Sequence, residues 1–451
     1  MTVLHAKSAL LPDGWAHDVT VQIGADGRIA TLDTAPAEHF LDILLPAPGN
    51  VHSHAFQRAM AGLTERRGAT GQDSFWTWRQ LMFRFLDRLT PGDMQAIAAQ
   101  VQMEMLEAGF AAVGEFHYLH HQPDGAPYDD LGEMCARIAA AARQTGIGLT
   151  LLPVLYQQGG VDGRALGPGQ IRFGNDRDRF FALLQAAGNA LSDLPQDTGL
   201  GVAPHSLRAV PPDALRELVA GTSGPLHMHL AEQMAEIDDI SAIYNARPVE
   251  WLLDNQPPDR RWCLIHCTQM LPEETTRLAA TGAVAGLCPI TEASLGDGIF
   301  DGRRWVDAQG AMAIGSDSNI RISLSEELRQ LEYSQRLKDH ARAVMAAPGG
   351  STGRFLFDAV LKGGAQALGR ASGAIAPGRF ADLISLDANA LDLTGRQEDS
   401  VLDTWLFTTG DRLVRDVWSA GRHVVRGGRH IARDAITREY RACLARLGGA
   451  M

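Results

Sequence analysis

Lysine and cysteine are both scarce in this sequence of 451 residues. The three lysines, Lys7, Lys338 and Lys362, lie away from the central apolar runs, which disfavours a two-metal site bridged by a carbamylated lysine. The five cysteines are odd in number and widely spaced, so a disulfide framework is not expected and a reducing compartment is favoured. We therefore expect a cytoplasmic location.

Long hydrophobic runs and an excess of basic charge are also missing. No stretch approaches the roughly 20 apolar residues that span a bilayer, and the first residues lack the pattern of a secretory leader. The 41 lysines and arginines stand against 53 aspartates and glutamates, which argues against a general nucleic-acid or membrane surface. We expect a small-molecule substrate, and a negatively charged one would need local arginines.

The two ends of the chain carry strand patterns. Residues 19–32 alternate apolar and polar side chains around an Asp26-Gly27 turn, which predicts a β-hairpin. Residues 373–390 and 413–431 also read as short strands broken by glycines. The two ends can therefore share one sheet.

Between these ends, short apolar runs alternate with helical patterns, as in the βα units of a parallel sheet. Residues 93–109, for example, place apolar side chains at helical spacing before a glycine. There is about one apolar run for each strand of a (β/α)₈ barrel, a fold that suits this length. The runs are residues 44–54, 111–118, 148–156, 199–206, 224–232, 262–268, 282–289 and 311–318.

The first chemical feature is His52-Ser53-His54 at the end of an apolar run. Residues two apart on a strand project from the same face, so the two imidazoles converge. Neutral imidazole binds zinc at about 2.0–2.1 Å, and active sites of barrels lie at the carboxyl ends of the strands. Taken alone, the pair fits a structural role about as well as a metal site.

The second feature is PLHMHLAEQ, where His227 and His229 share a face and Glu232 follows. We interpret His229 as a metal ligand because it lies nearer the strand end, and His227 as a packed residue behind it. Glu232 can be a plain surface carboxylate, but beside a metal it can serve as a proton carrier.

His266 in WCLIHCT and Asp317 in AIGSDSN close two further apolar runs. Each can be an ordinary strand-end residue, but polar groups at four strand ends of one barrel indicate a catalytic site. We expect one divalent ion per chain, with zinc favoured over other ions that accept the same donors. Its expected ligands are His52, His54, His229 and Asp317.

These motifs resemble the mononuclear deaminases of the amidohydrolase superfamily, with HSH, HLAE, CLIHC and GSDS spread along nearly the whole chain. GAIAPGRFADL resembles a run in the small β-sandwich of the same superfamily. The resemblance implies an α/β fold in which residues 46–370 form a (β/α)₈ TIM-type barrel. Residues 1–45 and 371–451 would form the β-sandwich and a tail.

A closer resemblance is to the formimidoylglutamate deiminases, carried by HSHAFQRAMAG, DSFWTWR, EFHYLHH, PHSLRAV, HLAEQ, VEWL, LCPITEASLGDGIF and GSDSNI. It implies hydrolysis of N-formimino-L-glutamate to N-formyl-L-glutamate and ammonia in histidine degradation, with a metal-bound hydroxide as nucleophile. It also implies a homodimer.

The same resemblance implies roles for individual residues. Asp317 would accept the proton of the attacking water, Glu232 would protonate the leaving nitrogen, and His266 would stabilise the charge on oxygen. The implied substrate-binding residues are Gln57, Tyr118, His205 and Arg208.

Several alternatives stay open on the sequence. The metal motifs also fit a deaminase or hydrolase acting on guanine, S-adenosylhomocysteine or a triazine, and a metal-free barrel with a structural role is a further hypothesis. Arg79 and Arg84 can contact the substrate or lie on a helix surface. The FWTW and ASLGDGIF segments can close over the substrate or form packing or dimer contacts.

Overall fold

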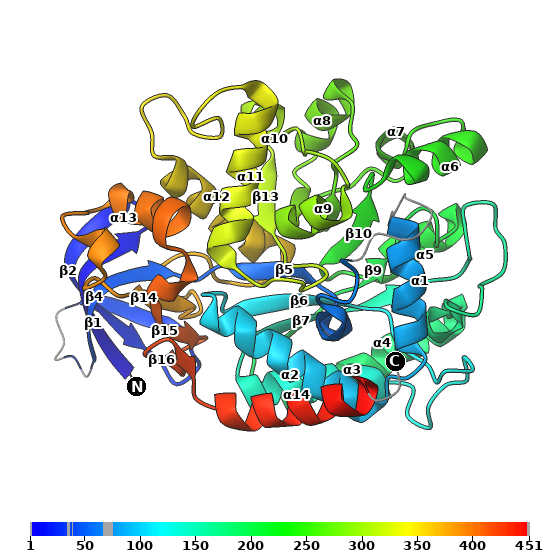
Figure 1. Ribbon diagram of the computed structural model, residues 1–451, viewed down its shortest axis with the longest axis horizontal. Coiled ribbons are helices and arrows are strands. Elements are labelled where there is room, and N and C mark those ends of the chain that lie inside the picture. Colours follow the sequence, from blue (N-terminus) through cyan, green and yellow to red (C-terminus); the bar gives the residue numbers. More distant parts are fainter. Residues whose placement is uncertain (1, 34–36, 38, 66–74, 449–451) are drawn as a thin grey trace.

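The computed structural model describes residues 2–33, 37, 39–65 and 75–448, except for the side chains of residues 75–77 and 80. The central part of the sequence folds into a barrel (Figure 1). Within these ranges it has eight successive strand positions, the fourth divided into two short pieces. Every strand lies inside one of the predicted apolar runs, so the (β/α)₈ fold is confirmed. The strands are β5 (Gly49–Ser53), β6 (Ala112–His117), β7 (Gly148–Leu155), β8 (Gly199–Leu200) with β9 (Ala203–Pro204), β10 (Leu226–Leu230), β11 (Trp262–His266), β12 (Val284–Leu287) and β13 (Ala311–Ile314).

Neighbouring barrel strands pair in parallel register, as connections through helices require. Two single bridges, Val202 with Leu226 and Ser53 with Asp317, join the two sets of strands into a ring. The second bridge links the first barrel strand to the segment after the last one. Closure of the barrel therefore brings the first histidine pair beside Asp317.

Helices cover the outside of the barrel (Figure 1). In α2 (Pro91–Glu107) the Thr90 side chain accepts a hydrogen bond from the Asp93 backbone, and Gly109 follows the helix with a φ of +101°. This confirms the helix predicted over residues 93–109. The other helices of the barrel region are α1 (Phe75–Leu86), α3 (Glu133–Thr145), α4 (Arg177–Leu191), α5 (Pro212–Gly221), α6 (Met234–Tyr244), α7 (Pro248–Asn255), α8 (Pro272–Ala279), α9 (Pro289–Leu295), α10 (Gly302–Asp307), α11 (Leu324–Asp339) and α12 (Thr352–Ala367).

The two ends of the chain form the predicted small β-sandwich, whose described strands follow the hydrogen-bonded order β17-β16-β15-β14-β4-β1-β2-β3. Its separate hydrophobic core takes Leu4 and Val21 from one end and Ile375 and Trp418 from the other. The hairpin predicted around Asp26-Gly27 is present. The strands are β1 (Thr2–Leu11), β2 (Gly14–Ile23), β3 (Ile29–Asp33), β4 (His39–Pro46), β14 (Leu383–Leu386), β15 (Val414–Ser419), β16 (Arg422–Arg426) and β17 (Arg429–His430).

The last helix, α14 (Arg433–Gly448), lies along α2 on the barrel, while the short α13 (Asp399–Thr404) lies beside α12 (Figure 1). Arg446 of α14 pairs with Asp93 of α2, and Cys443 contacts the same carboxylate. The C-terminal segment therefore contributes to both units, and the boundaries at residues 45/46 and 370/371 stay predictions.

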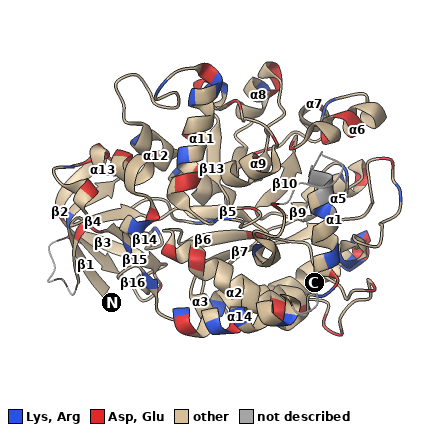
Figure 2. Ribbon diagram, in the orientation of Figure 1, with Lys and Arg blue, Asp and Glu red and all other residues tan. Residues whose placement is uncertain are grey.

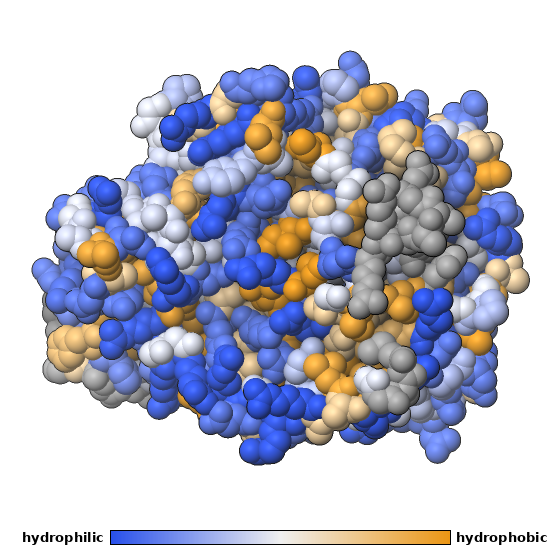
Figure 3. Space-filling model, viewed as in Figure 1, coloured by the Kyte–Doolittle hydropathy of each residue, from blue (hydrophilic) through white to orange (hydrophobic). Residues whose placement is uncertain are grey.

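Basic and acidic residues both occur along the outer helices, including α11 and α14 (Figure 2). The face in Figure 3 is mostly hydrophilic, with hydrophobic residues in small groups between hydrophilic ones. Across the residues described, none of the helices has both the length and the apolar character needed to cross a bilayer.

Candidate metal and substrate site

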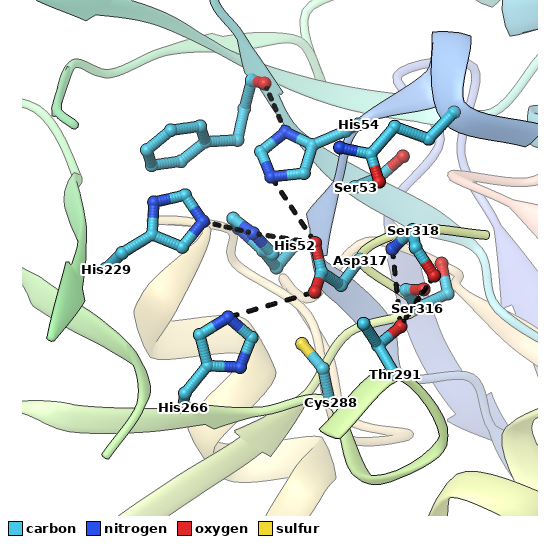
Figure 4. A network of polar contacts seen from close by, with 12 residues as sticks. His52, Ser53, His54, His229, His266, Cys288, Thr291, Ser316, Asp317 and Ser318 are labelled. Carbon is cyan, nitrogen blue, oxygen red and sulfur yellow. Dashed lines mark hydrogen bonds and ion pairs between the residues drawn. The ribbon is translucent and has the colours of Figure 1, made fainter. Parts of the chain in front are cut away.

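The four predicted metal ligands meet at the carboxyl ends of the barrel strands (Figure 4). His52 lies near the end of β5 and His54 directly follows that strand. His229 lies on β10, and Asp317 follows β13. Their ligand atoms all lie within 4.8 Å of one another, and all four residues are buried. Asp317 Oδ1 is 3.3 Å from His54 Nε2 and 3.5 Å from His52 Nε2.

The hydrogen bonds of the rings leave lone pairs pointing into this group. The Nδ1 atom of His54 donates to the Phe116 carbonyl at 3.0 Å, and that of His229 donates to the His205 carbonyl at 3.1 Å. Each Nε2 is then unprotonated, which is the arrangement that orients histidine ligands in metal sites. Burial lowers the pKa of His52 to about 3 and lowers those of His54 and His229 as well.

Two ring nitrogens approach each other beside the Asp317 carboxylate. His229 Nε2 lies 3.2 Å from His52 Nε2, within hydrogen-bond distance, and burial lowers the pKa of both rings. Three imidazoles with one carboxylate are donors that zinc and other divalent ions accept. The donor set therefore fits a single divalent ion.

A polar network ties the first histidine pair to the segment that carries Asp317 (Figure 4). The backbone amides of Ser316 and Asp317 both donate to the His52 carbonyl, at 3.0 and 2.9 Å. The Asn50 amide donates to Ser316 Oγ, and the Asn319 amide donates to Ser53 Oγ. These contacts fix the distance between ligands that are more than 260 residues apart in sequence.

Glycine is required next to this network. A side chain at Gly315 would place its Cβ 2.7 Å from the Cβ of His52 and 2.8 Å from the His52 backbone nitrogen and oxygen. Backbone atoms cannot move aside as a flexible side chain can, so any larger residue would push the last strand away from the first. Gly315 thus sets the close approach that the four ligands need.

Two further buried carboxylates position the site, and neither was singled out from the sequence. Glu115 accepts a hydrogen bond from the Ala55 backbone at 2.7 Å, directly after His54, and burial raises its pKa to about 8. Glu292 accepts from the Cys288 backbone at 2.7 Å and lies 3.3 Å from His266 Nδ1. A glutamate in either of these short sequence motifs could equally lie at the surface. Only the tertiary fold shows that Glu115 and Glu292 are buried beside the site.

His266 stands between the two predicted proton carriers. Its Nε2 atom lies 3.8 Å from Glu232 Oε1 and 3.8 Å from Asp317 Oδ2. Burial opposes a charge on this ring, but the surrounding carboxylates of Glu232, Glu292 and Asp317 raise its pKa to about 10. The ring therefore lies where it can donate a hydrogen bond among these three carboxylates.

Glu232 is buried and paired. Its Oε2 atom lies 3.4 Å from Arg208 Nη2, and Glu236 accepts hydrogen bonds from the backbone of Ala231 and Glu232. Beside it, burial and the neighbouring charge of Glu232 raise the pKa of Asp297 to about 9. The alternative of a plain surface carboxylate for Glu232 is wrong.

A cavity opens over the ligand group. The four predicted substrate-binding residues, Gln57, Tyr118, His205 and Arg208, all line it, together with Glu232 and Asp317. Gln57 lies in a short helical turn (Ala55–Met60) after His54, and its amide donates to the Tyr118 hydroxyl at 3.1 Å. The remaining lining residues are His54, Trp78, Arg79, Met82, Tyr156, Phe173, His229 and Leu295.

The structure decides between the two arginines of α1. Arg79 lines the cavity and donates to the Tyr156 hydroxyl at 2.9 Å, whereas Arg84 is exposed. Tyr156 follows β7, so it had the same strand-end signal as Tyr118 and was overlooked. His227, interpreted as a packed residue, donates to the Ala367 carbonyl at 2.8 Å and lies outside the ligand group.

Among the side chains that the structure describes, each of the two segments considered as covers contributes one lining residue. Trp78 of FWTW and Leu295 of ASLGDGIF line the cavity. The side chains of residues 75–77 and all of residues 66–74 lie outside the described part of the chain. Closure over a substrate stays a prediction.

Comparison with known proteins gives the class. A profile of the amidohydrolase family matches residues 43–424, and a profile of the N-terminal domain of formimidoylglutamate deiminase HutF matches residues 1–38. The chain belongs to the amidohydrolase family of hydrolases.

Relatives over the full length narrow this class. Formimidoylglutamate deiminase of Pseudomonas aeruginosa is 47% identical, covering 99% of this chain and 100% of the relative. A crystal structure of an amidohydrolase from Brucella melitensis matches with a TM-score of 0.94 and 48% identity, covering 99% and 100%. Within the amidohydrolases, the chain belongs to the formimidoylglutamate deiminase family.

More distant matches have other activities in their names. A 5-methylthioadenosine/S-adenosylhomocysteine deaminase of Natronomonas pharaonis is 27% identical, covering 90% of this chain and 86% of the relative. An adenosine deaminase structure from Xanthomonas campestris has a TM-score of 0.83 at 20% identity, covering 100% and 99%. The latter likeness shows the shared fold.

Proposed function

We propose that this chain hydrolyses N-formimino-L-glutamate to N-formyl-L-glutamate and ammonia, a step of histidine degradation. Membership of the deiminase family supports the reaction. The observation that carries the proposal is one cavity that combines candidate metal ligands, the buried carboxylate of Glu232 and the two arginines Arg79 and Arg208. These are the groups that hydrolysis of a dicarboxylate substrate requires.

The reaction consumes one water. Its oxygen becomes the formyl oxygen, the bond between the formimino carbon and the terminal nitrogen breaks, and both protons of the water finally reside on the departing ammonia. His52, His54, His229 and Asp317 would hold a divalent ion, for which we propose zinc, and that ion would act as a Lewis acid that lowers the pKa of bound water towards about 7. The protein must then move protons at two positions.

Asp317 and Glu232 are the proposed proton carriers. Asp317 accepts the proton of the attacking water, and Glu232 delivers a proton to the nitrogen so that it leaves as ammonia. His266, whose Nε2 lies 3.8 Å from both carboxylates, donates to the oxygen on which negative charge develops. Burial of all three side chains strengthens these interactions because bulk water does not screen them.

Arg208 and Arg79 are the proposed partners of the two substrate carboxylates. Arginine suits this role because its planar fork can donate two parallel hydrogen bonds to one carboxylate. Arg208 is buried, and its Nε atom has no hydrogen-bond partner among the described residues, so it retains a donor for the substrate. Gln57, Tyr118 and His205 complete the polar lining.

The alternative substrates are disfavoured by the same cavity. Guanine, S-adenosylhomocysteine and triazines present flat rings that carry no pair of carboxylates for Arg79 and Arg208 to bind. The metal-free hypothesis is disfavoured because the unprotonated Nε2 atoms of His54 and His229 belong to a buried group of four potential metal ligands.

Two further parts of the proposal concern the setting of the enzyme. The five cysteines are buried and unpaired in the described structure, which supports a reducing, cytoplasmic location. A homodimer is proposed from the general frequency of two-fold symmetric enzymes, and gel filtration with light scattering tests it.

The decisive assay follows ammonia release from N-formimino-L-glutamate by the purified, metal-analysed chain, beside guanine and S-adenosylhomocysteine. We expect turnover of formiminoglutamate alone, with one N-formyl-L-glutamate per ammonia. Glu232→Gln should lower kcat by about 10²- to 10⁴-fold because the proton carrier is lost. A metal-loaded protein that is inert on formiminoglutamate and active on a heterocycle would refute the substrate and keep the metal chemistry.

A further inference from the structure

A second group of potential ligand atoms lies on the outer side of β6. Side chains alternate along a strand, and the Phe116 ring packs against His52, His54 and His229 at the ligand group. The next residue, His117, is therefore directed to the opposite face, towards the helices that cover the barrel. There it meets His120 of the following segment and Cys135 of α3.

The three side chains form a compact buried cluster. One ring nitrogen from each histidine and the Cys135 sulfur all lie within 4.8 Å of one another. His117, His120 and Cys135 are each at most 2% exposed. The centroids of the two imidazole rings are 5.4 Å apart at an interplanar angle of 82°, so the rings meet edge to face rather than stacking.

Hydrogen bonds fix the tautomer of each ring. His120 Nε2 donates to the Val154 carbonyl at 3.1 Å, which leaves Nδ1 with a lone pair. His117 makes a hydrogen bond with the backbone of Leu119, and this bond raises the pKa of the imidazole, as a carbonyl acceptor does. The Nε2 atom of His117 has no hydrogen-bond partner among the atoms that the structure describes, so Nδ1 is the atom that makes this bond. Its Nδ1 therefore carries the proton and its Nε2 carries the lone pair.

These two lone pairs are buried without a hydrogen-bond partner anywhere in the described part of the chain. Burial also lowers the pKa of His117 to about 3 and that of His120 well below its ordinary value, so both rings are neutral at physiological pH. A buried acceptor that lacks a partner is costly, and two of them on histidines clustered with a thiol need an explanation. Histidines whose other nitrogen donates to a carbonyl are the usual ligands of a bound metal.

We propose that His117, His120 and Cys135 hold a second, structural zinc-class ion, separate from the ion at the catalytic site. Two imidazole nitrogens and one thiolate are donors that Zn²⁺ prefers, and water would complete a tetrahedral set. Ligand atoms around such an ion lie about 3.3–3.8 Å apart, so binding draws the group together by at most about 1.5 Å. Burial raises the pKa of the Cys135 thiol to about 12, and the ion must displace this proton on binding.

The site would join β6, the segment after it and α3. Tyr118, a lining residue of the substrate cavity, lies between two of the ligands in sequence. The ion would therefore hold the backbone that presents Tyr118 to the substrate. This inference does not depend on the identity of that substrate.

Cobalt titration of the complete metal-free chain tests the proposal, because Co²⁺ replaces zinc and a cobalt-thiolate bond absorbs in the near ultraviolet. We expect about two Co²⁺ per chain, with a thiolate band that corresponds to one of them. Cys135→Ser should remove the band and one ion, and His120→Gln should do the same while every cysteine is retained. Cys288→Ser is the matched control, because Cys288 lies beside His266 and Asp317, and the band should persist in it.

Several results would overturn the assignment. If the wild-type chain binds one or two Co²⁺ ions and shows no thiolate band, Cys135 is excluded as a ligand. This result needs no variant. A band that persists in Cys135→Ser, or disappears in Cys288→Ser alone, assigns the thiolate elsewhere. Far-ultraviolet circular dichroism of each variant identifies any that fails to fold, and the wild-type titration then decides. Loss of formiminoglutamate turnover plays no part in this test.

Discussion

Two buried charged clusters of this protein have opposite characters. At the carboxyl ends of the barrel strands, His52, His54 and His229 direct ring nitrogens towards one another and towards Asp317. Next to the amino-terminal ends of β7 and β8, Arg370 instead lies among carboxylates that it fully pairs.

The second cluster joins the barrel to the small β-sandwich. Arg370 donates to Asp382 at 2.7 and 2.9 Å and to Asp197 at 2.8 Å, and Arg422 of β16 donates twice to Asp197 at 2.7 Å. The backbone of Ala420 also donates to Asp382. Each positive charge in this cluster faces a negative one, and each named donor has an acceptor. The cluster therefore holds the barrel and the β-sandwich together and leaves few polar atoms for a ligand.

The difference teaches how to separate function from stability among buried polar groups. A cluster whose donors and acceptors are matched is complete as a structural feature, whereas a cluster of converging lone pairs is complete only with a cation. Substitution should therefore affect catalysis at the first cluster and stability at the second.

The largest expected effect is on catalysis. Asp317→Asn keeps the shape of the side chain but removes its charge and its ability to accept a proton, so ammonia release should fall by about 10⁴-fold. The melting temperature should change little. The matched control is Asp197→Asn, which should leave kcat near the wild-type value. Equal losses of kcat in the two variants would contradict the distinction.

The next effect is on stability. Arg370→Met leaves buried carboxylates without their partner and should lower the free energy of unfolding by about 3–5 kcal/mol, measured by urea denaturation. Turnover per folded molecule should be retained. Arg303→Met, which removes an exposed ion pair with Asp307, should cost about 0–1 kcal/mol. A destabilisation no larger than that of the control would show that the junction is not held by this network.

A smaller effect is expected in substrate recognition. Arg208→Lys retains a positive charge and loses the planar fork, which should lower kcat/KM for formiminoglutamate by about 10- to 100-fold, equivalent to one charged hydrogen bond. Most of the change should appear in KM. Arg84→Lys on the exposed side of α1 should have no effect. An unchanged KM in the Arg208 variant would exclude this residue as a carboxylate partner.

The smallest effect concerns pH. Burial opposes the charge of Asp197, but Arg422 and Arg370 hold its pKa below the ordinary value of 3.8. A carboxyl with a depressed pKa in the folded state stabilises the protein above 3.8, and this contribution is lost as the pH falls through the lower, folded-state value. The stability difference between wild type and Arg370→Met should therefore narrow from pH 7 to pH 3. Urea midpoints at both pH values measure it, and a constant difference would contradict the linkage.

Sequence periodicity predicted much of this architecture. The two-residue spacing of His52 and His54 on a strand, and the repeated placement of polar residues after apolar runs, predict the four side chains that the fold brings together. Each barrel strand fell inside a predicted run, and the two ends formed one sheet.

The parts that escaped prediction depend on contacts distant in sequence. Gly315 and Asn50 matter because β13 closes against β5, which no local pattern reveals. Arg79 and Arg84 could be distinguished only once α1 was placed over the cavity. His117 and Cys135 became a cluster only when α3 packed against β6.

The most direct test of the central claim is stepwise return of zinc to metal-free protein while ammonia release from N-formimino-L-glutamate is followed. The rate should rise from near zero in proportion to occupancy of the catalytic site in the wild type, and should stay near zero at every zinc concentration in Asp317→Asn. A metal-free wild-type chain that retains the full rate would contradict the claim that the converging lone pairs are completed by a catalytic cation.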